Sequence, residues 1–293
     1  VWGSALSFAF IFQVLTGIFL WMHYSPSAQT AWESVFFFQT QVPFGWLLRG
    51  MHHFMADVMM VLLVLHLTQV FIDKAYAAPR EVNFIFGVAL MGLTLALALT
   101  GYLLPWDQKG YWATKVATSI VGLTPVIGPD LQRVVVGGAE YGHHTLTHFF
   151  ALHAGVLPIL FVLLVAAHVA LFRRHGIKAK QPYKKPTEYF WPDQVLKDAI
   201  AAIAVMLAVG FLSVKTNLLN PEAMLGAELT APADPSNPYP ARPEWYFLFL
   251  FQFIELPPFR GEGAVLGAIV IPTLTMAFLC LMPFWGRWKV GHF

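Results

Sequence analysis

Four histidines lie in two pairs within long apolar stretches of this 293-residue sequence. His52 and His66 are fourteen residues apart, and His153 and His168 are fifteen residues apart. An ionisable side chain inside a membrane is costly and usually has a functional partner. Neutral imidazole is a good iron ligand. Two segments that each carry two histidines therefore predict two metal centres, one near each surface of a membrane.

Helix geometry indicates how these histidines could pair. In an α-helix, His52 and His66 lie about 40° apart around the axis and about 21 Å apart along it. The corresponding values for His153 and His168 are about 60° and about 22 Å. If the two helices run in the same direction, His52 meets His153 at one level and His66 meets His168 at the other. Two facing imidazoles can bind a haem from both sides, so we expect two bis-histidine haems.

Four glycines repeat the histidine interval. Gly3 and Gly17 are fourteen residues apart, as are Gly87 and Gly101, and both pairs lie in other apolar stretches. Because glycine has no Cβ, it lets a flat macrocycle approach the helix backbone. Small residues also serve contacts between membrane helices, and the spacing alone leaves both interpretations open. The repetition of the interval on two stretches favours room for haem.

The composition is that of a polytopic membrane protein. The sequence is 57% hydrophobic and 12% charged, whereas a soluble domain has roughly 25% charged residues. The formal charge of +2 is too small to suggest a nucleic-acid partner, and the single cysteine, Cys280, excludes an internal disulfide and a cysteine-based metal cluster. Val1 already lies in an apolar run, so we expect natural residues before it, and trimming after Phe293.

The predicted fold is all-α. Six stretches contain the roughly 20 apolar residues that a membrane-spanning helix needs. They are residues 3–23, 51–71, 84–104, 149–172, 199–219 and 264–285. The first four would form a four-helix haem-binding domain, 1–176, and the other two would belong to a second domain, 177–293. The long connections after the third and fifth stretches are expected to contain amphipathic helices at the outer membrane interface.

Basic residues in the connections predict the orientation. Cytoplasmic loops of membrane proteins carry an excess of lysine and arginine. Such residues follow the second and the fourth stretch: Lys74, Arg80, Arg173, Arg174, Lys178, Lys180, Lys184 and Lys185. We therefore expect these two connections, and both ends of the segment, to be cytoplasmic. The two histidine-bearing helices would then be parallel, with His52 and His153 at the outer level.

Six motifs occur along almost the whole chain. They are QVLTG at 13–17, RGMH at 49–52, GYLLPWDQ at 101–108, TPVIG at 124–128, LH at 152–153 and PEWY at 243–246. With them the chain resembles cytochrome b of the Rieske–cytochrome b complexes, the bc- and bf-type quinol–cytochrome c oxidoreductases. The fifteen-residue histidine interval is similar to that of the chloroplast-type branch. The part that resembles subunit IV is fused here, which favours a bacterial plasma membrane.

The resemblance implies a quinol-oxidising site at the outer face. The motif with Glu244 and Tyr246, and the helix after Trp112, would form its walls, and Glu244 would take a proton from quinol. A carboxylate at an apolar, aromatic edge can have a raised pKa that suits this transfer. Without the resemblance, Glu244 would be read as an interfacial acid.

The resemblance also implies an electron path and partners. One electron would pass to a Rieske iron–sulfur protein and on to a c-type cytochrome. The other would cross both non-covalent b-type haems to a quinone at the inner face, with proton translocation, in a homodimeric complex. Arg49 would bind a haem propionate, and Arg80 and Arg173 would lie near the inner haem and quinone. Arginine suits these roles because it stays charged and binds carboxylates with two hydrogen bonds. Arg80 and Arg173 could instead anchor the surface.

Three positions depart from the family pattern, and two other functions compete. Gln69 stands where an arginine often occurs, Asp57 where the family has a small residue, and Val1 where bf-type proteins have the cysteine that tethers a further haem. We therefore expect no covalent haem. The alternatives are a dihaem anchor of a dehydrogenase or hydrogenase, and a transporter with a histidine proton relay. The 243–246 motif and the Trp106–Asp107 loop argue against the anchor.

Overall fold

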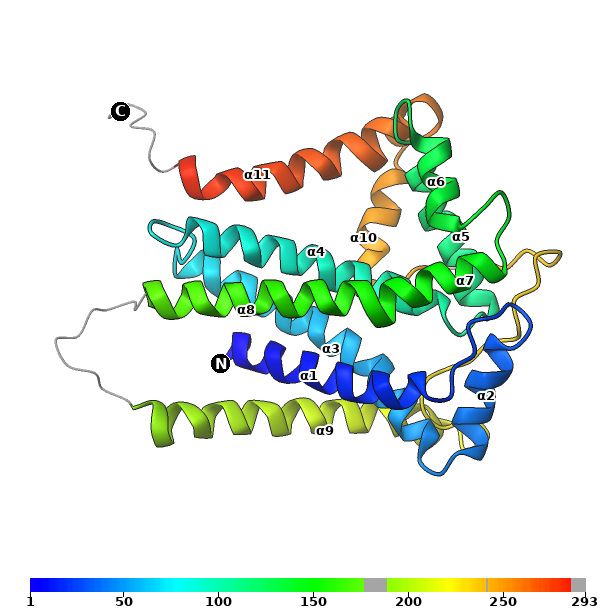
Figure 1. Cartoon of the computed structure of the whole chain (residues 1–293), viewed down its shortest axis with the longest axis horizontal. Coiled ribbons are helices and arrows are strands. Elements are labelled where there is room, and N and C mark those ends of the chain that lie inside the picture. Colours follow the sequence, from blue (N-terminus) through cyan, green and yellow to red (C-terminus); the bar gives the residue numbers. More distant parts are fainter. Residues whose placement is uncertain (177–188, 241, 286–293) are drawn as a thin grey trace. The chain divides into compact units, whose positions relative to one another are not determined.

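The computed structural model describes residues 1–176, 189–240 and 242–285 (Figure 1). Lys178, Lys180, Lys184 and Lys185, which contributed to the predicted orientation, lie outside the described residues, and so does the start of the predicted second domain. The long helices are α1 (Trp2–Trp21), α3 (Gly45–Ile72), α4 (Glu81–Leu103), α8 (Leu157–His175), α9 (Val195–Leu219) and α11 (Ile271–Trp285).

Shorter helices lie between the long ones. They are α2 (Ala31–Gln41), α5 (Gln108–Gly122), α6 (Gly128–Val136), α7 (His143–Phe150) and α10 (Trp245–Ile254). Single turns of π-helix occur at η1 (Ala151–Val156), η2 (Phe190–Gln194) and η5 (Leu266–Val270), and 3₁₀ turns at η3 (Pro257–Phe259) and η4 (Gly261–Gly263). Among the described residues, β-pairing is limited to an isolated bridge between Asp107 and Pro232.

Six helical spans within the described residues are long and apolar enough to cross a membrane, which confirms the predicted all-α membrane fold. Three of them join several elements, as His143–His175, Phe190–Leu219 and Gly261–Trp285. The fourth span begins before its predicted start at residue 149, because the polar residues of α7 hide it from hydropathy. That helix is capped by the Thr145 side chain, which accepts the Gly142 N–H at 3.0 Å.

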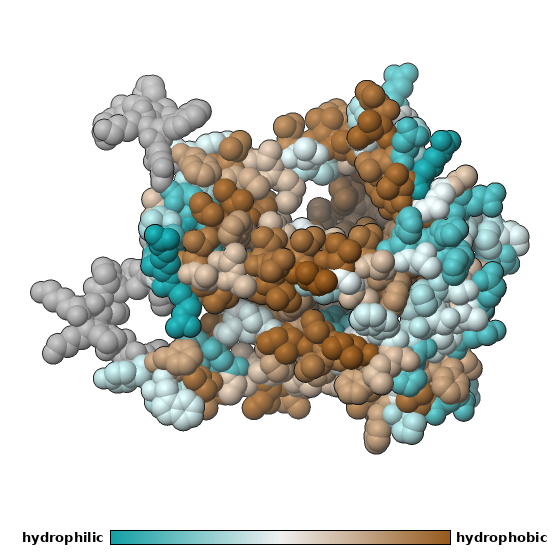
Figure 2. Space-filling model, in the orientation of Figure 1, coloured by the Kyte–Doolittle hydropathy of each residue, from teal (hydrophilic) through white to brown (hydrophobic). Residues whose placement is uncertain are grey.

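The outer faces of these helices are apolar. Figure 2 shows hydrophobic side chains gathered along the spans, with hydrophilic ones toward the helix ends. On α9, Ile203, Leu207 and Phe211 follow one another at intervals of four residues and are all more than half exposed. Contiguous apolar surface of this kind marks contact with a lipid phase or a partner, and helices satisfy their backbone groups in lipid. The protein is an integral membrane protein.

One compact unit comprises Val1–Tyr24, Glu33–Tyr76 and the described part of Phe172–Leu229. In it α3 packs against both α1 and α9. The backbone of α3 comes close to α9 and the turn after it at Gly50. A Cβ added to Gly50 would lie 3.0 Å from the Gly226 Cα and 3.0 Å from the Ser213 hydroxyl. Glycine at this position therefore lets α9 and the turn that follows it lie against α3.

The other unit comprises Ser25–Trp32, Ala77–Leu171 and the described part of Thr230–Phe293. Here α4 contacts α5, α7 and α11, and α5 packs on α6. The connection after the third span thus folds into α5 and α6, and the connection after the fifth contains α10. That helix is apolar apart from Gln252. Residues of both predicted domains, 1–176 and 177–293, occur in each unit.

Candidate functional site

In the first unit, two histidines on α3 face two glycines on α1. A Cβ built on Gly17 would lie 3.3 Å from the His52 Cε1, and one on Gly3 would lie 3.5 Å from the His66 Cε1. Each imidazole therefore packs against helix backbone at a position where a side chain would narrow the space. The two contacts are fourteen residues apart on both helices.

The second unit repeats this arrangement with α4 and the helix that contains η1 and α8. A Cβ on Gly101 would lie 2.6 Å from the His153 Cε1, and one on Gly87 would lie 3.4 Å from the His168 Cε1. Each unit thus supplies one histidine pair with its own pair of glycines. The pairing of His52 with His153, and of His66 with His168, joins residues of different units and stays a prediction.

The unequal histidine intervals have a local structural cause. His153 lies in the π-helical turn η1 (Ala151–Val156). A π-turn holds about one residue more than an α-turn. An interval of fifteen residues that includes the π-turn therefore rotates around the helix axis by about as much as fourteen residues of regular α-helix. His153 and His168, fifteen residues apart, can therefore face Gly101 and Gly87, which are fourteen residues apart on α4. Sequence periodicity could not show this, because it assumes regular helix throughout.

Hydrogen bonds define the tautomer of His52. The hydroxyl oxygen of buried Thr16 lies 2.9 Å from the His52 Nδ1. A hydroxyl has one hydrogen, and that of Thr16 points to backbone carbonyls of its own helix, with Phe12 O at 2.8 Å. The Nδ1–H of His52 therefore donates to Thr16, and Nε2 carries the lone pair that a metal ion needs.

The histidines of the second unit have the same tautomer. The His153 Nδ1 lies 3.0 Å from the Leu97 carbonyl oxygen and 3.2 Å from the Thr100 hydroxyl. The His168 Nδ1 lies 3.0 Å from the Asn83 carbonyl oxygen. Because a carbonyl only accepts, both rings carry Nδ1–H. This is the usual state of a metal-binding histidine, whose other nitrogen is oriented by a hydrogen bond, so these residues fit haem iron.

The predicted propionate ligand, Arg49, is buried in a network of the first unit. Its Nη1 donates to the Gln39 side chain and, at 2.8 Å, to the Ala227 carbonyl. Its Nη2 donates to the Glu228 carbonyl at 3.0 Å. Arg49 therefore fixes the segment after α9 onto α3 and α2, a structural role that the sequence did not indicate. A role with propionate stays a prediction.

The other two predicted arginines lie at helix ends. Arg80 is the half-buried N-cap residue of α4, in the second unit. Arg173 is exposed in the last turn of α8, which belongs to the first unit. Their expected proximity to an inner haem and quinone stays a prediction.

A polar cluster beside Gly3 was missed in the sequence. The Ser4 hydroxyl is 2.7 Å from the Asp198 carboxylate and also close to a backbone acceptor in its own helix, and the Gln194 amide donates to the same carboxylate oxygen at 2.8 Å. Ser4 and Asp198 are 194 residues apart, so no local motif could reveal the contact. A half-buried carboxylate in a membrane helix is a candidate functional group.

Glu244 is the N-cap residue of α10 and is half-buried. Its carbonyl accepts the Phe247 N–H at 2.9 Å. The ring of Tyr246 lies between aromatic neighbours, with centroid distances of 5.5 Å to Trp245 and 5.0 Å to Phe247. The start of α10 therefore places one carboxylate and one phenol in aromatic surroundings, which suits a proton acceptor beside an apolar ring.

The segment that leads to Glu244 is anchored on the start of α5. Buried Asp107 caps α5 by accepting the Gly110 N–H at 2.8 Å, and its second oxygen accepts the Thr230 N–H at 3.0 Å. The Gln108 N–H donates to the Ala231 carbonyl at 2.9 Å. The motif at 101–108 therefore fixes the position of residues 230 and 231, where the segment that leads to the 243–246 motif begins.

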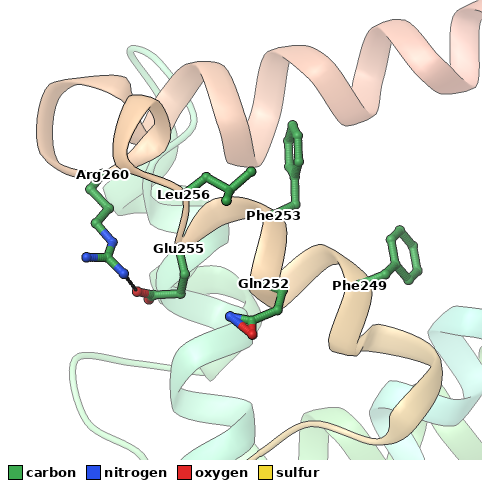
Figure 3. Close-up of a pocket in the computed structure, with 6 residues that line it drawn as sticks. All are labelled: Phe249, Gln252, Phe253, Glu255, Leu256 and Arg260. Atoms are coloured by element: carbon green, nitrogen blue, oxygen red, sulfur yellow. Dashed lines mark ion pairs between the residues drawn. The ribbon is translucent and has the colours of Figure 1, made fainter.

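A pocket of about 530 Å³ lies along the later part of α10 (Figure 3). The lining residues are Phe249, Gln252, Phe253, Glu255, Leu256 and Arg260. The Arg260 guanidinium pairs with Glu255 at 2.8 Å, beside the Gln252 amide, while the two phenylalanine rings project from other sides of the helix. Glu244 and Tyr246 are not among its lining residues. The pocket is therefore separate from the predicted proton acceptor.

Known proteins are similar to this chain in sequence and fold. The sequence pattern of the family described as cytochrome b/b6/petB matches residues 1–176. The cytochrome bc complex cytochrome b subunit of Chlorobaculum thiosulfatiphilum is 37% identical over 298 residues, which cover 97% of this chain and 65% of that protein. The chain thus spans about two thirds of that relative's length.

Two further comparisons agree. The menaquinol:cytochrome c reductase cytochrome b subunit of Bacillus subtilis (strain 168) is 44% identical over 176 residues, which cover 60% of this chain and 79% of the relative. A solved structure described as hyperthermophilic respiratory Complex III matches with a TM-score of 0.81 and 28% identity, over 97% of this chain and 74% of that chain.

Proposed function

Because this chain belongs to the cytochrome b/b6 family, we propose that it is the cytochrome b subunit of a bc- or bf-type quinol–cytochrome c oxidoreductase. The observation that carries the proposal is the repeated site: two histidine pairs, each facing a glycine pair on a neighbouring helix. A transporter with a proton relay would not need glycine opposite every histidine. A binding site for a flat metal macrocycle would.

The four histidines would hold two b-type haems. His52 and His153 would bind the outer haem, and His66 and His168 the inner one, through Nε2. The haems, when bound, supply one-electron transfer across the membrane between the two quinone sites. Both would be non-covalent, since the single cysteine, Cys280, lies on α11. Gly3, Gly17, Gly87 and Gly101 would keep the space beside the imidazoles open.

Quinol would be oxidised beside Glu244. An ionised carboxylate within hydrogen-bond reach of a quinol hydroxyl can act as general base. Tyr246 and its aromatic neighbours would exclude water and contact the quinol ring. The Bacillus subtilis relative is named for menaquinol, and a menaquinol would suit the same aromatic wall.

The inner quinone would bind near the cluster of Ser4 and Asp198 in the first unit. Arg80 and Arg173 are the arginines that the family resemblance implies near the inner haem and quinone. A quinone that is reduced must take up protons. The Ser4 hydroxyl can donate a hydrogen bond to a quinone oxygen, and Asp198 can deliver a proton, which is the chemistry that such a site needs.

The partners and the location follow from this function. A Rieske iron–sulfur protein would receive one electron of each quinol and reduce a c-type cytochrome, and the complex would be a homodimer. The segment would lie in a bacterial plasma membrane with both ends in the cytoplasm. Proton release at the outer site and uptake at the inner site would translocate protons.

The first test is a reduced-minus-oxidised spectrum of the purified protein with a redox titration. We expect two b-type haems with distinct potentials. Absence of b-type bands would exclude both the proposed function and the dihaem-anchor alternative.

Replacement of His66 by alanine should remove one haem, and retention of both would refute the ligand assignment.

The second test concerns Glu244. We expect Glu244→Gln to slow quinol oxidation and to remove the pH dependence that the carboxylate imposes, while both haems stay bound. Quinol oxidation that matches the parent protein across the pH range would rule out the proton-transfer role.

A further inference from the structure

Two threonines occupy matching positions in the two units. Thr16 on α1 directly precedes Gly17, and Thr100 on α4 directly precedes Gly101. Both side chains are buried, at 3% and 7% exposure. Each hydroxyl contacts the Nδ1 of the histidine that faces the adjacent glycine, at 2.9 Å in the first unit and 3.2 Å in the second.

The direction of these hydrogen bonds is fixed by the helices. The Thr100 hydroxyl donates to the Ala96 carbonyl at 2.8 Å, as the Thr16 hydroxyl donates to the carbonyl of Phe12. Both oxygens can therefore only accept from Nδ1–H. The Nδ1–H of His153 is shared between the Thr100 hydroxyl and the Leu97 backbone carbonyl at 3.0 Å, whereas His168, which we place at the inner level, donates to the backbone carbonyl of Asn83. Threonine hydroxyls are thus found at the two histidines assigned to the outer haem.

We propose that Thr16 and Thr100 are positioning residues for the outer haem. They accept from the Nδ1–H of both axial imidazoles, Thr100 together with the Leu97 carbonyl, and fix the ring planes. Donation from Nδ1–H to an oxygen raises the basicity of Nε2, which favours ferric iron. The pair of threonines therefore lowers the reduction potential of the outer haem and leaves that of the inner haem unaffected. This inference rests on the proposed function.

The test uses Thr16→Val and Thr100→Val, which keep the side-chain shape and remove the hydroxyl. In Thr16→Val we expect the reduction equilibrium of the outer haem to shift toward the ferrous form by about three- to tenfold, where tenfold corresponds to about 59 mV for a one-electron couple. Thr100→Val should shift it in the same direction but by less, because the Leu97 carbonyl still accepts from His153. The inner haem serves as the internal reference. Ferric electron paramagnetic resonance should also show a changed largest g value for the outer haem, because the imidazole planes are no longer fixed.

Three variants serve as controls. Thr16→Ser and Thr100→Ser keep a hydroxyl and should restore the parent potential and g value. Thr94 is a buried threonine on α4 whose hydroxyl donates to the Leu90 carbonyl at 2.8 Å. It matches the other two in helix bonding but is not hydrogen-bonded to a haem-ligand histidine, so Thr94→Val should leave both potentials unchanged.

The outcomes separate the two proposals. If the parent protein binds no b-type haem, the proposed function fails. If it binds two haems and neither valine variant changes the outer potential or g value, the positioning role is wrong, and a shift confined to the inner haem also overturns it. Selective loss of the outer haem in a valine variant, with recovery in the serine variant, supports the positioning role.

Discussion

At the residue scale, the site depends on glycines that touch imidazoles. The contact is tightest at Gly101, where an added Cβ would lie 2.6 Å from the His153 Cε1. That ring is also held by the hydrogen bond from Nδ1 to the Leu97 carbonyl on the same helix as Gly101. An alanine at this position would therefore force the ring out of its place, because the clash is with an atom that has little freedom to move.

We predict that Gly101→Ala displaces His153 and weakens binding of the outer haem by about tenfold or more, the effect typical of a disturbed ligand environment. Haem content and the α-band spectrum would measure it. The matched control is Gly92→Ala on the same helix, where nothing lies within 4 Å of an added Cβ, and both haems should remain. Parent-like haem content and potentials in Gly101→Ala would contradict the prediction.

The sequence could identify the histidines and glycines because they share one interval. It could not identify Thr16 as the partner of His52, or Asp198 as the partner of Ser4. Those contacts join residues that are 36 and 194 positions apart, and single hydroxyls in apolar helices are common. All three threonine hydroxyls, of Thr16, Thr100 and Thr94, donate to their own helix. Only the packing of a neighbouring helix determines that the first two also contact an imidazole.

At the element scale, the π-turn η1 lets two histidines fifteen residues apart, His153 and His168, face two glycines fourteen residues apart, Gly101 and Gly87. We predict that deletion of Gly155, which lies inside this turn, converts it to a regular α-turn and preserves both haems, since the remaining fourteen-residue interval matches Gly87 and Gly101 directly. Haem stoichiometry per chain is the measurement. Insertion of one alanine after Gly155 is the control and should cost at least one haem. If the deletion variant loses haem and the insertion variant keeps both haems, the proposed effect of the π-turn on the histidine interval is wrong.

The anchored start of α5 gives another prediction. Asp107 accepts two backbone N–H groups, from Gly110 and Thr230, and an asparagine can accept only with its single oxygen. Asp107→Asn should lower the free energy of unfolding by about 1.5–3 kcal/mol, the usual value of a hydrogen bond to a charged group. Thermal unfolding followed by helicity would measure the loss.

The control for Asp107 is Asp130, an exposed acid on α6 that lies 3.7 Å from Arg133. An exposed ion pair contributes about 0–1 kcal/mol, so Asp130→Asn should change the unfolding temperature little. Equal effects of the two substitutions would show that the Asp107 anchor does not stabilise the fold.

Hydropathy identified the six spans, because lipid demands about 20 apolar residues in a helix. It did not identify α2, whose sequence mixes polar and aromatic residues, or the early start of the fourth span at His143. Both depend on local hydrogen bonding and packing rather than on a long run of apolar side chains. The amphipathic character expected after the fifth span is also absent from α10, which is almost uniformly apolar.

At the scale of the whole molecule, the compact units do not follow chain order. Residues 189–229 pack with the first helices, whereas the described residues after 229 pack with α4 and its neighbours. Hydropathy predicts the number of membrane spans and their approximate positions. It carries no information on which helices are neighbours, since that depends on side-chain fit such as the close contact at Gly50.

The proposed orientation is testable with single cysteines. The sequence contains one cysteine, so Cys280→Ser gives a cysteine-free background. Glu140→Cys would then lie just before the span His143–His175 and Arg174→Cys in its last turn, both at exposed positions. A membrane-impermeant maleimide added to intact spheroplasts should label position 140 and not position 174, with both labelled after lysis. The opposite pattern would reverse the orientation.

The different acceptors of the histidine Nδ1–H groups have a consequence for evolution. A backbone carbonyl, such as that of Asn83 beside His168, is present whatever residue occupies the position, so mutation cannot remove it without disturbing the helix. The hydroxyls of Thr16 and Thr100 can be gained or lost by a single codon change. Lineages that meet quinols of different potential could therefore adjust the potential of the proposed outer haem by one substitution, while the fold itself preserves the acceptor of His168.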